Sequence, residues 1–132
     1  MGKSDKRLLE NHRFYSISLT VDGRALLFNW KAVSDVSNND YMDAIRKIAN
    51  YSKKDRPYLV LIDKRKLKSD VNFDHDWWRS EILPQYHEAG FAGFAHITGN
   101  PAADGTFLNA PEGIRFKMGE FKDIESALKW EP

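Results

Sequence analysis

The chain has 132 residues, 42% of them apolar, which is enough for a single domain whose core needs no metal or disulfide. Its 20 basic and 19 acidic residues leave a net charge of +1, which excludes a strong overall attraction to nucleic acid or anionic membranes. Cysteine is absent, which excludes disulfides, thiolate nucleophiles and cysteine metal sites. Residues 1–12 are polar and charged, without the apolar core of a signal peptide. We therefore expect a cytoplasmic protein with a polar tail over residues 1–12, one domain over residues 13–132, and no stable membrane insertion.

The first structured segment is predicted to be a β-hairpin. Residues 14–20 alternate apolar and polar side chains, which is typical of a strand with one buried face. Asp22 and Gly23 form a turn signal, and the apolar residues 25–30 return as the second strand.

A helix and a buried strand follow the hairpin. Ser37 can cap a helix, with Asp40 three residues later as a near capping box, and the helix is broken at Pro57. Residues 58–62 are continuously apolar, which predicts a central parallel strand covered on both faces.

The second half of the chain contains further strand–helix units. A helix is predicted from about residues 72–74 to Gly90, with Pro84 able to kink it. Short strands are predicted over residues 94–98 and 114–118, separated by a long loop rich in Gly, Pro, Asn and Ala. Residues 123–130 form the closing helix. The predicted fold is an α/β mixed sheet of about five strands, with an N-terminal hairpin, mainly parallel inner strands and three to four packed helices.

Four segments resemble the STAS-like family, in particular its SpoIIAA-like branch. They are the strand and acid LVLIDKRKL, the aromatic helix DHDWWRSEILP, the strand FAHIT, and the closing FKDIESALKW. The resemblance covers the order of elements over residues 14–130. It implies a bacterial, non-enzymatic domain that regulates or binds a protein partner through the loop and helix after the central strand.

In regulatory STAS domains, a Ser or Thr at the start of that helix is phosphorylated, and this switches partner binding. Ser69 is the one hydroxyl residue between Asp63 and Asp76, and its setting departs from the Asp-Ser-Ser or Asp-Ser-Thr-Gly pattern of the family. The predicted binding residues are Asp63, Arg65, Ser69, Trp77 and Trp78.

Each of these residues also has a purely structural interpretation. Asp63 lies where ligands gather in open α/β sheets, but it can equally cap the next loop or pair with Arg65. The basic run over residues 64–68 fits either an anion contact or a solvated loop. Trp77 and Trp78 fit core packing, an apolar pocket or a dimer face.

The remaining polar clusters give weak catalytic and metal signals. Asp74, His75 and Asp76 are consecutive, so on a helix their side chains diverge by about 100° per residue and cannot converge on one atom. The four histidines lack metal-ligand spacing, and His96 is predicted to be a hydrogen-bonded core residue. We therefore expect no catalytic residues, metal or cofactor.

Three functional hypotheses follow. The first is a regulatory domain that binds a protein partner, with a homodimer compatible with it. The second is a binder of a small apolar or lipid-like ligand in an aromatic pocket beside the basic loop. The third, ranked last, is a hydrolase that uses Asp63, His75 and Asp74.

Overall fold

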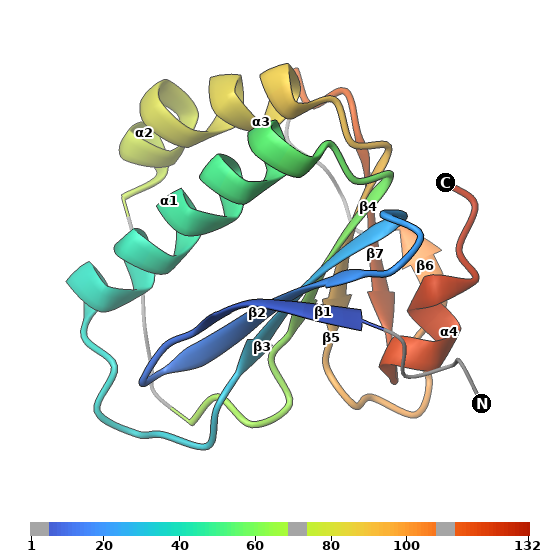
Figure 1. Ribbon diagram of the computed structural model, residues 1–132, viewed down its shortest axis with the longest axis horizontal. Helices are drawn as coiled ribbons and strands as arrows, with labels where there is room; N and C mark the ends of the chain where they lie inside the picture. The colour runs from blue at the N-terminus through green and yellow to red at the C-terminus, as the bar shows by residue number, and fades with distance from the viewer. Residues whose placement is uncertain (1–5, 69–73, 108–112) are drawn as a thin grey trace.

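The computed structural model describes residues 6–68, 74–107 and 113–132, and within them the chain has an α/β fold. Seven strands of this part form one mixed sheet, in the order β1-β2-β3-β4-β5-β7-β6 (Figure 1). The strands are β1 (Lys6–Asn11), β2 (Tyr15–Thr20), β3 (Ala25–Trp30), β4 (Leu59–Asp63), β5 (Gly93–Ile97), β6 (Asp104–Phe107) and β7 (Lys117–Phe121). The helices are α1 (Asn38–Asp55), α2 (His75–Trp77), the π-helical turn η1 (Trp78–Ile82), α3 (Leu83–Ala89) and α4 (Ile124–Leu128).

The predicted N-terminal hairpin is present as β2 and β3, which pair antiparallel. Gly23 supplies the positive φ of 75° that the turn requires, and the carboxylate of Asp22 accepts hydrogen bonds from the Thr20 hydroxyl and the Arg24 amide.

The prediction of a polar tail over residues 1–12 is wrong for Lys6–Asn11, which form the edge strand β1. A bulge between Leu8 and Glu10 leaves two residues of β1 opposite Ile17 of β2. Leu9 packs on the larger hydrophobic core, which lies between the sheet and helix α1. The carboxylate of Glu10 accepts hydrogen bonds from the Lys47 ammonium group and from the Tyr51 hydroxyl, both at 2.8 Å. This strand could not be predicted from its charged sequence, because an edge strand buries only a few of its side chains and so shows no clear apolar pattern.

The centre of the sheet is parallel, as predicted. Strands β3, β4, β5 and β7 pair in parallel, and β4 lies fourth of the seven strands. Its residues alternate between the two sides of the sheet: Val60 and Ile62 face one core, and Leu59 and Leu61 face the other. Burial on both faces explains the unbroken apolar run.

The described residues form seven strands rather than about five, and the two additional strands are the edge strands β1 and β6. The last strand, β7, spans Lys117–Phe121 rather than residues 114–118, and β6 lies inside the segment predicted to be a loop. Phe116 precedes the strand and packs on Phe91, with ring centroids 4.8 Å apart. A short strand in Gly- and Pro-rich sequence has too few residues to show an alternating pattern.

The helices begin and end near the predicted positions. Ser37 and Asp40 form a complete capping box at the start of α1, and Asp74 caps α2. The second helix is continuous from α2 to α3, but its middle is the π-helical turn η1, in which the Leu83 amide donates to the Trp78 carbonyl. Pro84 explains this turn, because in a regular α-helix its ring would clash with the carbonyl of Ser80.

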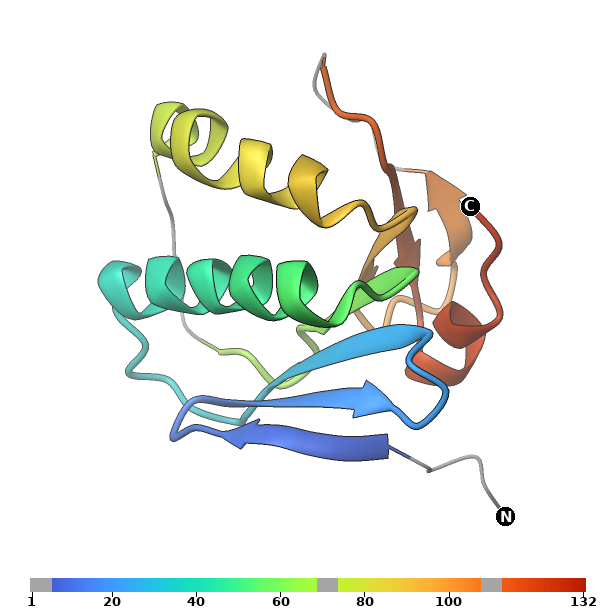
Figure 2. The same cartoon turned by 45° about the horizontal axis from the view of Figure 1, so that its top comes forward.

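Two hydrophobic cores lie on opposite faces of the sheet. Helix α1 and the α2–η1–α3 segment lie side by side over one face (Figures 1 and 2), and helix α4 covers a smaller core on the other. In the described part of the chain, no helix combines the length and apolar character needed to cross a membrane.

Candidate functional site

A cavity of about 210 Å³ lies between the main face of the sheet and the helices above it. Helix α1 contributes Ala44, Ile45 and Ile48, and the sheet contributes Ile62 and Met118. The remaining apolar walls are aromatic and come from five different segments: Trp30, Tyr41, Trp78, Tyr86, Phe94 and Phe116. For comparison, a dry apolar cavity of about 150 Å³ binds benzene. The space therefore fits one aromatic ring with a short substituent.

The aromatic walls are held together by ring contacts. Tyr86 of α3 is fully enclosed, and its ring lies 5.5 Å from Phe94, 6.2 Å from Phe116 and 6.4 Å from Trp78 between centroids. Burial raises the pKa of Tyr86, so its hydroxyl stays protonated. On the opposite side, Trp30 stacks on Tyr41 at 5.6 Å. Edge-to-face and stacked rings make a stiff wall rather than a collapsible one.

Two basic side chains, Lys64 and His96, form the polar end of the cavity. Lys64 directly follows β4, and its amide donates to the Ile97 carbonyl of β5 at 2.9 Å. His96 lies on β5, in register with Ile62 of β4. Both therefore lie at the carboxyl ends of neighbouring parallel strands, where open α/β sheets bind their ligands.

Burial shifts the pKa of both groups in the same direction. It lowers the pKa of Lys64. Burial also lowers the pKa of His96 to about 3, with a smaller contribution from the Lys64 charge, so the imidazole is neutral at physiological pH. The Nδ1 atom of His96 is buried and has no hydrogen-bond partner within the described part of the chain.

The turn η1 brings Trp78 into the cavity wall. Trp77 and Trp78 are consecutive and both partly buried, but only Trp78 lines the cavity. A π-helical turn is rare and is often found at functional sites, because it re-aims side chains without breaking the helix.

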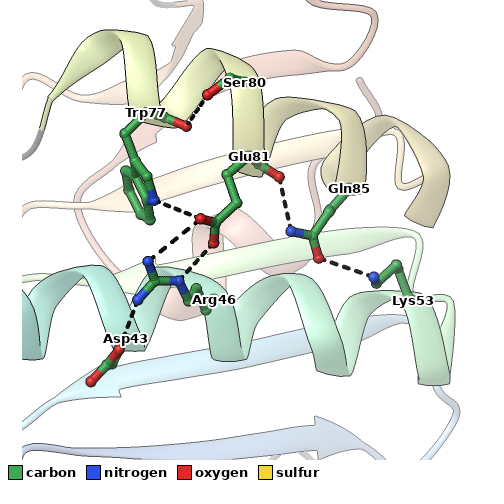
Figure 3. A network of polar contacts seen from close by, with 7 residues as sticks. All are labelled: Asp43, Arg46, Lys53, Trp77, Ser80, Glu81 and Gln85. Carbon is green, nitrogen blue, oxygen red and sulfur yellow. Dashed lines mark hydrogen bonds and ion pairs between the residues drawn. The ribbon is translucent and has the colours of Figure 1, made fainter.

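A polar network ties this turn to helix α1 (Figure 3). The carboxylate of Glu81 accepts from Arg46 Nε at 2.6 Å and from Trp77 Nε1 at 2.8 Å. The guanidinium of Arg46 also lies 5.1 Å from the Trp77 ring centroid. Further along, Lys53 of α1 donates to the Gln85 side chain at 3.0 Å. The two helices that roof the cavity are thus joined at two points.

The predicted binding residues do not form one surface. Asp63 continues the Leu59–Leu61 side of β4, so it faces away from the cavity, and its carboxylate accepts three hydrogen bonds from Arg65, the shortest 2.7 Å long. This is the pairing given by the structural interpretation. Trp77 and Trp78 lie on the other side of the sheet, with the main core. Ser69 lies outside the described residues.

The other predicted features have structural roles where the chain is described. Arg65, Lys66 and Lys68 are exposed, as a solvated loop requires, but Lys64 of the same run turns inward. The carboxylate of Asp74 accepts from the Asp76 amide at 2.8 Å, which is a helix cap. Among the residues that the structure describes, no cluster of three or more His, Cys, Asp or Glu side chains is suited to a metal ion.

Lys64 and His96 were not among the predicted binding residues, although the sequence carries a signal for them. Residues at every second position of a strand share a face, so Val60 and Ile62 place Lys64 on the same side of the sheet. The same alternation places His96 with Phe94. The pairing of β4 with β5, which joins the two groups, could only be guessed from chain order.

Comparisons with protein-family models, curated proteins and solved structures return no match. The STAS-like resemblance and the regulatory role that it implies therefore stay predictions, and the cavity is the feature from which a function can be argued.

Proposed function

We propose that this chain is a binding domain for a small apolar or aromatic molecule, held in the cavity between the sheet and helices α1 and α3. The observation that supports it is the cavity of about 210 Å³ with six aromatic walls. The cavity is partly open to solvent, so its aromatic side chains lose contact with water when an apolar ligand binds, which is favourable.

The form of the cavity favours a small ligand over a long lipid chain. Small-molecule sites are apolar concave surfaces with a few polar groups that fix orientation. Here the two basic side chains, Lys64 and His96, lie at neighbouring strand ends, and aromatic and aliphatic side chains form the rest of the lining. A molecule the size of toluene or indole fits this space.

The experiment is a titration with neutral probes: benzene, toluene, indole and cyclohexanol. Trp30 and Trp78 line the cavity and report binding through their fluorescence. At a probe concentration of about 100 times its dissociation constant, the folded state gains about 2.7 kcal/mol, which raises the melting temperature by several degrees.

The matched variant is Ile45→Phe, which enlarges the cavity wall from helix α1. We expect it to remain folded and to lose the response to probes. If no probe changes the fluorescence or the melting temperature of the original chain, the proposal is wrong. Unchanged binding to a folded Ile45→Phe variant would place the probes elsewhere and would contradict it equally.

A further inference from the structure

We infer that the ligand of this cavity carries a carboxylate, which is bound by the Lys64 ammonium group and the imidazole N–H group of His96. The inference rests on the proposed function and adds a ligand class to it: a small aromatic or branched aliphatic acid. The argument uses the position of the cation, the neutral imidazole beside it, and the size of the apolar space.

Lys64 provides a cation without a counter-ion at the end of an apolar cavity. Its side chain lies largely inside the protein, and no carboxylate of the described residues lies within ion-pair distance of it. The adjacent acid, Asp63, faces the other side of the sheet and is paired with Arg65 at 2.7 Å. Lysine is rarely buried without a partner, because desolvating a charge is costly. An anion in the cavity offsets that cost.

Glu120 is a further acid near this end of the sheet. It is in register with His96 on the neighbouring strand β7, so the two share a face of the sheet. Its carboxylate accepts a hydrogen bond from the Thr98 hydroxyl at 2.6 Å, and it does not line the cavity. Glu120 is therefore directed to the rim, and Lys64 remains the charged group that meets the ligand.

His96 provides a second donor at the same end. The Nδ1 atom of His96 is buried and has no hydrogen-bond partner among the described residues, so it is closed to a ligand in the cavity. Neutral imidazole carries one N–H group, and the tautomer protonated at Nε2 can donate to an acceptor there. A carboxylate has two oxygens, so it can accept from Lys64 and from His96 together.

The charge and size of the site favour a carboxylate over a phosphate. One lysine balances a single negative charge, whereas phosphate sites use several backbone amides, often at a helix N-terminus or in a glycine-rich loop. Among the described residues the cavity wall contains neither, and its two basic side chains lie with six aromatic residues. The apolar body of the ligand therefore packs among the rings while its acid group lies at the Lys64 end.

The experiment compares phenylacetate with phenylacetamide, which has nearly the same shape and no charge, at pH 7. We expect phenylacetate to bind about tenfold to a hundredfold more tightly, as for a hydrogen bond to a charged group. In Lys64→Met, which keeps the length of the side chain, phenylacetate affinity should fall to that of the amide, and amide affinity should be unchanged. Lys66→Met removes an exposed lysine two residues away and should keep the full preference.

The outcomes separate this inference from the proposed function. Equal affinities for the acid and the amide, or a preference that survives in Lys64→Met, overturn the carboxylate inference and leave the cavity as a neutral site. Binding of neither compound, together with failure of the neutral probes, overturns both. If Lys64→Met does not fold, Lys64→Gln gives the same comparison, and His96→Leu should reduce the preference by removing the second donor.

Discussion

Lys64 and His96 are two basic groups that face one apolar space, and their environment makes both harder to protonate. The dominant cause is loss of water around each side chain, and the Lys64 charge adds to it at His96. A buried histidine that stays neutral makes the stability of the protein depend on pH, because the unfolded chain can bind a proton there and the folded chain cannot.

The first prediction concerns the pH dependence caused by His96. Its pKa in the folded protein is about 3, below the ordinary value of 6.5, so its contribution is lost as pH falls from 6.5 toward 3. At pH 5, protonation of His96 in the unfolded chain lowers the free energy of unfolding by about 2 kcal/mol relative to neutral pH. Urea unfolding at pH 7.5 and pH 5.0 should therefore show a larger loss of stability for the original chain than for His96→Leu. Equal losses in the two proteins would contradict the neutral, buried state of His96.

At the residue level, Asp63 and Arg65 were predicted as binding residues, with their pairing as one structural alternative, and the inward turn of Lys64 was not predicted. Four cations in the run over residues 64–68 have the same local composition, so composition cannot distinguish the buried one. The distinction comes from the neighbouring strand β5, whose Ile97 carbonyl binds the Lys64 amide. A contact between residues so distant in sequence is a property of the fold.

At the level of elements, the position of the α2–η1–α3 segment depends on contacts with α1. Glu81 joins Arg46 and Trp77 at the π-helical turn, while Gln85 and Lys53 join the helices further along (Figure 3). The sequence predicted the helix and an effect of Pro84. It did not predict the π-helical turn, because a proline can be accommodated by a kink, a break or a wider turn.

The second prediction tests this connection by exchange of backbone amide hydrogens. Glu81→Ala removes the acceptor that joins α1 to the turn, so amides of η1 and α3 should exchange severalfold faster than in the original chain. Asp43→Ala is the matched control: Asp43 also binds Arg46, at 2.9 Å, but both residues lie on α1. In the Asp43→Ala variant, the amides of η1 and α3 should exchange at the same rate as in the original chain. Equal acceleration in both variants would mean that the link between the helices is not what holds the turn.

At the level of the whole molecule, the C-terminal segment crosses the second face of the sheet and packs on its centre. The Trp130 ring lies 5.3 Å from that of Phe121, and Arg24 donates to the Trp130 carbonyl at 2.9 Å. Gly93 and Gly119 of neighbouring strands make room for this ring: a Cβ atom on Gly93 would lie 2.6 Å from it, and one on Gly119 would lie 3.2 Å from it. Glycine is required at these two positions because the Trp130 ring lies close to the backbone, not because the chain turns there.

The third prediction is a coupling between Gly93 and Trp130. Gly93→Ala should lower the free energy of unfolding by about 1–3 kcal/mol, because the added methyl group overpacks the contact. In the double variant Gly93→Ala with Trp130→Ala, the loss in the free energy of unfolding should be smaller than the sum of the two single losses by more than about 0.5 kcal/mol.

The control for this cycle is Gly23→Ala, in a turn where a Cβ atom would meet nothing within 4 Å. Gly23→Ala destabilises the fold because residue 23 has a positive φ. Its loss in the free energy of unfolding should therefore add to the loss caused by Trp130→Ala within about 0.5 kcal/mol. Denaturant unfolding measures all five variants. Additive losses for Gly93 and Trp130 would contradict the packing of the chain end on the sheet.

The fold could be predicted further from the sequence than the site could. The hairpin, the central strand and the helix caps come from patterns within a few residues, which a single sequence displays. Strands β1 and β6 lie at the two edges of the sheet, where few side chains are buried and the alternating pattern fades. The cavity could not be predicted from the sequence, because its walls come from four strands, two helical segments and the residues next to them, which meet only in three dimensions.

The π-helical turn makes the place of Trp78 depend on the number of residues in the helix. Each residue of an α-helix turns the chain by about 100°, so a helix with one residue fewer in this turn would direct Trp78 to a different side. Such a chain would keep its capped start at Asp74, its packed Tyr86 and nearly the same composition. A relative of this protein that differs by one deletion in this helix would thus retain the fold and present a differently shaped cavity. Sequence alignments that allow a gap here would join proteins whose cavities differ in shape.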